Sequence, residues 1–321
     1  MVSDGIEQAR QLSSPASRTP LAFEGFFLKG GRLRARWRFL IFVALWALCE
    51  RTLFSAAAPL MVRAQGSRLP LPAFLVWALS FLAVMIPTAV MARIERRPLR
   101  AYGLPARGAF GALFWKGAAW GLVALTARIL ALRAIGAYSF GEVALRGPDV
   151  ARYGLSWALV FLMIALFELY ALLGYPQVVL STRIGFWPAA TALSVFFGTI
   201  HLFNGGLRSG RFGVDWASGL FTGVLAVLFF FTLRRTGNLW FVVGLETGFN
   251  WGDGFLFSLP DGGRQAVGHL LSSHVQGSPS LTGGDGILDL MMLAALFVAL
   301  HRRYPDVAYP PKTSAAGHSG S

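Results

Sequence analysis

The sequence predicts an all-α, polytopic membrane protein with about eight transmembrane helices. Of its 321 residues, 55% are hydrophobic and only 14% are charged. The apolar residues come in long blocks instead of amphipathic stripes, and a soluble protein of this length could not bury all of them. The first 35 residues are polar and contain no short apolar core followed by a small-residue cleavage site, so we expect no cleaved signal peptide.

Eight apolar segments are each close to the roughly 20 residues that cross a bilayer as a helix. They cover residues 38–62, 70–92, 109–135, 155–180, 186–203, 213–233, 238–258 and 285–301. The connection 259–284 is rich in glycine and in turn sequences such as PDGG, and it is therefore expected to be a loop.

Four regions follow from this pattern. The polar ends, residues 1–35 and 304–321, are predicted to be disordered tails, because they are poor in apolar residues and show no periodicity. Residues 36–150 hold the first transmembrane helices, and residues 151–303 hold a second transmembrane region that carries most of the buried polar side chains.

The net charge of +14 comes from Lys and Arg residues at the ends of the apolar segments, so it does not indicate a nucleic-acid site. The more basic set of alternate connections contains Lys29, Arg32, Arg34, Arg36, Arg38, Arg93, Arg96, Arg97, Arg100, Arg107, Arg183, Arg234, Arg235, Arg302, Arg303 and Lys312. The other set holds only Arg63, Arg68, Arg146, Arg152, Arg208 and Arg211. With eight spans, both termini are predicted to be cytoplasmic, and the expected partner of the basic residues is anionic lipid of the inner leaflet.

Polar side chains in the first half have structural explanations. Glu50 and Arg51 can neutralise one another, and Lys116 can extend from a segment end to the membrane surface. In the second half, Glu246 and Asn250 are four residues apart and share one face of a helix.

The stretch FFGTIHLFN carries a second polar stripe, with Phe197 one turn before His201 and Asn204 almost one turn after it. Facing lipid, these groups and Glu168 would lack hydrogen-bond partners, so they are expected to converge on an interior cavity. There Glu168 could act as a general base on water, His201 could transfer the proton, and Asn250 could donate to an oxyanion. A hydrogen-bonded cluster that only fixes helix packing is an equally good interpretation of the residues alone.

The stretches ELYALLGYPQ, GFWPAATALSVFFGTIHLFNGG and LWFVVGLETGFNWGDGFLFSLPDGG resemble the CPBP family of intramembrane proteases, from about residue 155 to 300. That family includes the CAAX prenyl endopeptidases and the bacteriocin-processing and immunity proteins. The resemblance implies a protease-like core in residues 151–303, a bacterial inner membrane location, and a hydrophobic or lipidated peptide or protein as substrate.

The family is marked by the motifs Glu-Glu-x-x-x-Arg, Phe-x-x-x-His and His-x-x-x-Asn or Asp. Glu168 matches the first glutamate, Phe197 and His201 match the second motif, and Asn250 matches the last position of the third. By this resemblance Glu168 and His201 activate the water, Asn250 supports the oxyanion, and Phe197 and Asn204 support the site.

Three motif positions differ: Leu169 replaces the second glutamate, Leu173 the arginine and Glu246 the second histidine. Loss of both members of a buried ion pair can be neutral for stability, but the pair no longer orients the helix. A carboxylate at position 246 would repel a developing oxyanion.

Two functions stay open on this basis, and the three changes favour altered or lost catalysis. The first is an endopeptidase, with Glu168, His201 and Glu246 as candidate ligands of a divalent metal such as zinc. The second is a pseudoenzyme that binds a membrane peptide or lipidated tail as a scaffold or immunity factor. A transporter is disfavoured because the polar centre lies in only one half of the chain.

Overall fold

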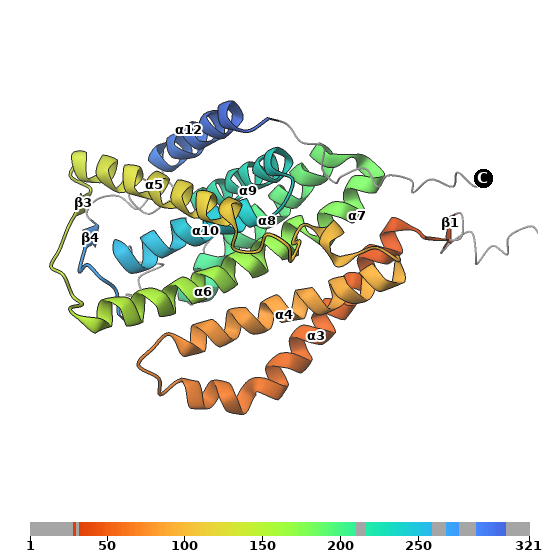
Figure 1. The fold of residues 1–321 in the computed structure, drawn as a ribbon, viewed down its shortest axis with the longest axis horizontal. Coiled ribbons are helices and arrows are strands. Elements are labelled where there is room, and N and C mark those ends of the chain that lie inside the picture. Colours follow the sequence, from red (N-terminus) through yellow and green to blue (C-terminus); the bar gives the residue numbers. More distant parts are fainter. Residues whose placement is uncertain (1–27, 30–31, 210–215, 259–267, 276–286, 306–321) are drawn as a thin grey trace, which may run out of the picture.

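The computed structural model describes residues 28–29, 32–209, 216–258, 268–275 and 287–305, and these residues are almost entirely helical (Figure 1). The helices are α3 (Ala35–Ala64), α4 (Leu71–Ile94), η1 (Leu99–Tyr102), α5 (Ala112–Ala134), α6 (Pro148–Leu173), α7 (Tyr175–Ile184), α8 (Phe186–Ser209), α9 (Trp216–Thr236), α10 (Trp240–Trp251), the π-helical turn η2 (Gly252–Leu256) and α12 (Ile287–Arg303). The short strands are β1 (Leu28–Lys29), β2 (Arg32–Leu33), β3 (Tyr138–Ser139) and β4 (His274–Val275).

The all-α polytopic class is confirmed, and each predicted apolar segment contains a helix. Six helical stretches in the described residues are long and apolar enough to cross a membrane: Ala35–Ala64, Leu71–Ile94, Ala112–Ala134, Pro148–Ile184, Phe186–Phe203 and Gly219–Thr236. The predicted spans at 238–258 and 285–301 correspond to shorter helices, α10 with 12 residues and α12 with 17. A 12-residue helix rises only about 18 Å, against a hydrocarbon core of about 30 Å.

The predicted fourth segment, 155–180, is not continuous. Helix α6 ends at Leu173, Gly174 leaves the helical backbone conformation with ψ −119°, and α7 starts at Tyr175 with Pro176 in its first turn. Proline has no amide hydrogen to donate to the preceding turn, so it favours a new helix start here. The break divides a stretch of 37 residues, which would otherwise be far longer than the bilayer is thick.

Two antiparallel strand pairs lie outside the helices. β1 pairs with β2 inside the region predicted as the N-terminal tail, so ordered structure begins earlier than expected. β3 pairs with β4, and this ties the connection after α5 to the described part of the long loop 259–284. The rest of that loop and of both predicted tails (1–27 and 306–321) lies outside the described residues.

The most basic helix ends contact one another at one end of the bundle. Arg38 at the start of α3 reaches Glu95 at the end of α4, and Arg234 at the end of α9 lies over the ring of Phe186 at the start of α8. Arg235 donates to the backbone oxygen of Tyr304, just after α12. The connections grouped by charge in the sequence are therefore neighbours in space, as the positive-inside rule requires of a common side.

Glu50 has partners other than the one expected. The Trp46 indole and the Ser80 hydroxyl both donate to its carboxylate, at 3.1 and 3.2 Å, whereas Arg51 is exposed. Glu50 thus joins α3 to α4 through neutral donors, and its role remains structural.

Helix α10 lies in the middle of the bundle, against α5, α6 and α9 (Figure 1). All of its residues from Trp240 to Gly248 are buried. Its contact with α5 depends on glycine: a Cβ on Gly117 or Gly121 of α5 would lie 2.0 Å from a backbone oxygen of α10. A Cβ on Gly244 or Gly248 would lie 2.0 or 2.2 Å from a backbone oxygen of α5. Four small residues spaced by four let the two backbones touch, as in close-packed membrane helices.

Candidate active site

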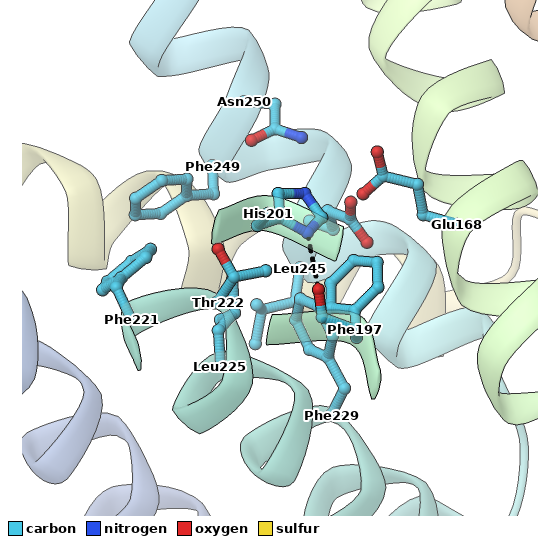
Figure 2. A pocket seen from close by; sticks show the side chains of 11 residues that line it. Glu168, Phe197, His201, Phe221, Thr222, Leu225, Phe229, Leu245, Phe249 and Asn250 are labelled. Atoms are coloured by element: carbon cyan, nitrogen blue, oxygen red, sulfur yellow. Dashed lines mark hydrogen bonds between the residues drawn. The ribbon is translucent and has the colours of Figure 1, made fainter. Parts of the chain in front are cut away.

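A cavity of about 170 Å³ lies between helices α6, α8, α9 and α10 (Figure 2). Its lining consists of Glu168, Phe197, His201, Phe221, Thr222, Leu225, Phe229, Leu245, Glu246, Phe249 and Asn250. This volume holds several water molecules. The polar groups are thus gathered in one apolar-walled cavity inside the bundle.

Each motif residue reaches the cavity from the helix that the sequence assigns to it. Glu168 comes from α6, His201 from α8, and Glu246 and Asn250 from successive turns of α10. In Figure 2 the carboxyl of Glu168, the ring of His201 and the amide of Asn250 point towards a common space. Close packing of α10 on α5 directs the opposite face of α10, with Glu246 and Asn250, towards this space.

The hydrogen bond of His201 determines which ring nitrogen faces the cavity. Its Nδ1 lies 2.9 Å from the backbone oxygen of Phe197. A carbonyl oxygen only accepts, so Nδ1 carries the hydrogen, and in the neutral ring Nε2 keeps a lone pair. Figure 2 shows the second ring nitrogen on the side of Asn250. The Phe-x-x-x-His spacing thereby presents Nε2 to the cavity as a base or ligand.

Glu246, at the substituted histidine position, lines the cavity next to Glu168. Two carboxyl groups so close together repel each other when both are charged, and they can share one proton instead. Glu246 is 6% exposed, and its Oε2 has no hydrogen-bond partner among the described residues. One oxygen of this neighbouring carboxyl pair, Glu246 Oε2, is thus left without a hydrogen bond at the cavity.

The other two substituted positions lie in the apolar core. Leu169 is 1% exposed and Leu173 is fully buried, and both belong to the main cluster of buried side chains. Helix α6 therefore packs through leucine where the family motif has a charged pair. Asn204 belongs to α8, but its side chain lies outside the described part of the structure.

The sequence also predicts a metal site at Glu168, His201 and Glu246. In the described residues, no group of three or more His, Cys, Asp or Glu side chains is arranged to hold a metal ion. The unpaired Glu246 Oε2 and the His201 Nε2 have the right chemistry for ligands, but the set is not preformed. Zinc binding at this site therefore stays a prediction.

Several lining residues were not predicted. Thr222 of α9 is 8% exposed and supplies a hydroxyl to the cavity wall, and Phe221 and Phe249 supply aromatic surface. Thr222 is one of several hydroxyl residues in an apolar segment, a signal too common in membrane helices to indicate a site. The signal that could have located α10 was its Gly244-x-x-x-Gly248 spacing, matched by Gly117-x-x-x-Gly121 in α5.

Comparison with known proteins supports the identity of this region. Residues 151–252 match the family model described as type II CAAX prenyl endopeptidase Rce1-like. No curated protein and no solved structure matches the chain. The matched segment covers about a third of the chain and contains every motif position discussed above. This segment is therefore similar to the CAAX-type intramembrane proteases of the CPBP family.

Proposed function

We propose that the protein is an intramembrane endopeptidase that hydrolyses a peptide bond with a pair of glutamic acids, Glu168 and Glu246. The observation that carries this proposal is the position of these two carboxyl groups next to each other in the lining of a cavity large enough for several water molecules. Two carboxyl groups that share one proton supply a base and an acid side by side, as in the aspartic proteases.

In the first step, the ionised carboxylate of Glu168 accepts a proton from a water molecule while the water oxygen attacks the substrate carbonyl carbon. Protonated Glu246 donates its hydrogen to the carbonyl oxygen, which becomes a hydroxyl of the tetrahedral intermediate. The carbon–nitrogen bond then breaks as the amide nitrogen takes the proton from Glu168. The hydroxyl returns its proton to Glu246, and a carboxylic acid and an amine leave.

This assignment removes the electrostatic conflict at position 246. An ionised glutamate would repel the developing negative charge, whereas a protonated glutamate donates a hydrogen bond to it. His201 Nε2 and the Asn250 amide face the same space and would orient the water and the carbonyl oxygen.

The lining and the membrane location indicate the substrate class. Most of the residues that line the cavity are aromatic or aliphatic. A hydrophobic or lipidated peptide could enter such a cavity from the lipid without giving up contacts with water. We also propose that both termini are cytoplasmic, which the cluster of basic helix ends supports, and that the membrane is a bacterial inner membrane with anionic lipids, which the resemblance supports.

A noncatalytic role has one observation in its favour. The Glu168 carboxyl lies next to that of Glu246, so water is not its only polar neighbour, and a protein that only binds a membrane peptide or lipidated tail could retain this arrangement. Such a protein would act as a scaffold or immunity factor.

The test is a cleavage assay in lipid nanodiscs with a library of apolar and prenylated peptides. Wild type should cleave at least one class, and Glu168→Gln should lower the rate by about 10²–10⁴-fold, the usual contribution of a general base. Glu50→Gln is the matched control, because Glu50 is a hydrogen-bonded glutamate of a membrane helix that does not line the cavity. Peptide binding without cleavage by wild type would favour the scaffold, and equal cleavage by wild type and Glu168→Gln would refute the role of Glu168.

A further inference from the structure

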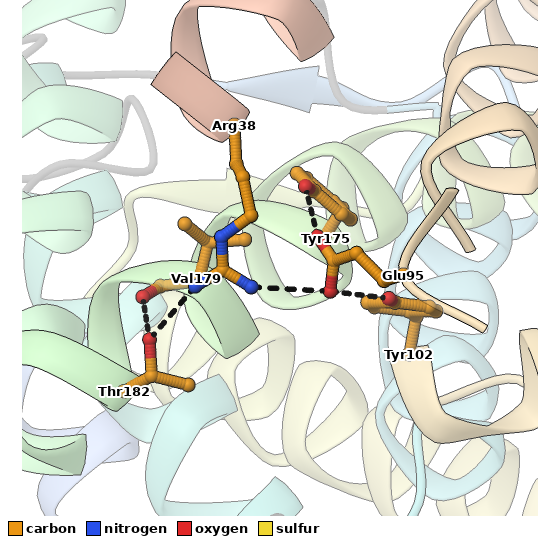
Figure 3. Close-up of polar contacts among 6 residues, drawn as sticks. All are labelled: Arg38, Glu95, Tyr102, Tyr175, Val179 and Thr182. Atoms are coloured by element: carbon orange, nitrogen blue, oxygen red, sulfur yellow. Dashed lines mark hydrogen bonds and ion pairs between the residues drawn. The ribbon is translucent and has the colours of Figure 1, made fainter. Parts of the chain in front are cut away.

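A second polar network lies apart from the cavity, where α3, α4, η1 and α7 meet (Figure 3). Its centre is Glu95, which follows the last residue of α4. Tyr175 donates to Glu95 Oε1 at 2.5 Å and Tyr102 donates to Oε2 at 3.1 Å. Arg38 lies 3.2 Å from Oε2 and also donates to Thr182 at 3.4 Å. The Glu95 carboxylate thereby connects the end of α4 and the adjacent η1 to the distant helices α3 and α7.

Burial makes this network costly to disturb. The Glu95 side chain is 7% exposed and that of Arg38 is 17% exposed, and both tyrosines are fully buried. Burial and the neighbouring Glu95 raise the pKa of Tyr102, so its hydroxyl stays protonated and keeps donating. Arg38 Nε has no hydrogen-bond partner among the described residues, but both oxygens of Glu95 are bonded, and removal of Arg38 would leave the Glu95 charge uncompensated.

The network connects directly to the helix that carries Glu168. Tyr175 is the first residue of α7, immediately after the break at Gly174 that ends α6. The Tyr175 ring stacks on Phe42 of α3 at 4.7 Å and lies 5.3 Å from that of Tyr102. Tyr175, two residues after the end of α6, therefore packs on rings of α3 and η1.

The same N-terminal helices also contact α6 on both sides of Glu168. Phe167 lies 6.1 Å from Trp46 of α3 and 5.7 Å from Trp77 of α4, measured between ring centroids. Tyr170 lies 6.1 Å from Phe81 of α4. Residues directly before and shortly after Glu168 thus pack on the α3–α4 hairpin, which lies outside the segment that matches the family model.

We infer that the Glu95 network positions Glu168 by locking the α3–α4 hairpin against the end of α6, in place of the motif ion pair that Leu169 and Leu173 have removed. Arg38, Glu95, Tyr102 and Tyr175 are positioning residues, since none of them lines the cavity. This inference rests on the proposed function for its effect on catalysis. Its structural part, the immobilisation of α6 near Glu168, stands independently.

The test compares Tyr175→Phe and Glu95→Gln with Tyr138→Phe. Tyr138 is a matched control, because it is also a buried tyrosine with two hydroxyl contacts, to Ser273 and to the backbone of Phe257, but it lies on the β3 side of the bundle. Tyr175→Phe and Glu95→Gln should lower kcat about tenfold or more with little change in KM, because the base is displaced while the cavity is kept. Tyr138→Phe should leave kcat within about twofold of wild type, even if its thermal stability falls equally.

Amide hydrogen exchange of the peptide segment 166–173 separates the two proposals, because it needs no activity. Exchange there should become faster in Tyr175→Phe and Glu95→Gln and stay unchanged in Tyr138→Phe. If wild type has no peptidase activity but this exchange pattern holds, the proposed function fails and the locking of α6 stands. Unchanged exchange in Tyr175→Phe and Glu95→Gln would overturn the inference, as would an unchanged kcat in an active enzyme.

Arg38→Lys, which keeps the charge, should retain more activity than Arg38→Met. Equal losses of activity in the two variants would also contradict the inference.

Discussion

Replacing Gly244 by alanine should displace α10 from α5 and move Glu246 without altering any residue of the cavity. The new Cβ would lie 2.0 Å from the backbone oxygen of Phe114 and 3.0 Å from the backbone nitrogen of Ala118. Backbone atoms cannot rotate away as a flexible side chain can, so the helices must separate by about 1 Å before this contact becomes acceptable.

Two opposing terms set the change in stability. Alanine favours the helix over glycine by about 0.8–1.0 kcal/mol, whereas overpacking a tight contact costs about 1–3 kcal/mol. The net effect should be a loss of up to about 2 kcal/mol. Activity should fall further than stability, because a displacement of about 1 Å at a catalytic group can lower the rate about 100-fold.

Thermal unfolding in detergent and peptide cleavage in nanodiscs measure these two effects. Gly66→Ala is the control, because the nearest atom to its new Cβ lies at 3.8 Å, an ordinary contact. Wild-type stability and rate in Gly244→Ala would show that α10 does not depend on the close contact with α5.

Further outcomes follow from the membrane topology and from the substituted motif positions. Reporters fused after residue 100 and after residue 235 should read as cytoplasmic and one fused near residue 270 as external, and an external signal at 235 would break the alternation of the spans. Leu169→Glu should lower the free energy of unfolding by several kcal/mol, because it buries a carboxylate without a partner; the addition of Leu173→Arg should recover most of the loss, and a double variant no more stable than the single one would argue against pairing of these positions. The predicted zinc ligands require stoichiometric zinc in wild type, measured by elemental analysis, and its loss in Glu246→Gln; equal zinc in both proteins would refute that ligand set.

The parts of the fold that depend on local sequence were predictable. Helix positions followed from the lengths of the apolar segments, since a membrane accepts little other than helix. Glu168, His201 and Asn250 could be grouped because unsatisfied polar groups in hydrocarbon must turn inward, and because their spacing resembles a family pattern. The break at Gly174 was also marked in the sequence, by the Gly-Tyr-Pro that follows α6. The length of the apolar segment alone did not indicate this break.

Contacts between distant segments could not be read from the sequence in the same way. Glu50 stands beside Arg51 in the chain, yet it accepts from Trp46 and from Ser80, which is 30 residues away. Glu95 stands between Arg93 and Arg96 in the sequence, and nothing local indicated that Tyr102 and Tyr175 would both donate to it. The short length of α10 likewise fits its place among other helices, where every residue from Trp240 to Gly248 is buried.

The most direct test of the carboxyl pair is a double-mutant cycle of kcat/KM with Glu168→Gln, Glu246→Gln and the double variant in nanodiscs. If the two glutamates share one proton and act as a unit, each single variant should lose about 10²–10⁴-fold and the double variant should be hardly worse than either. Losses that multiply in the double variant, or a Glu246→Gln protein as active as wild type, would contradict the shared-proton mechanism.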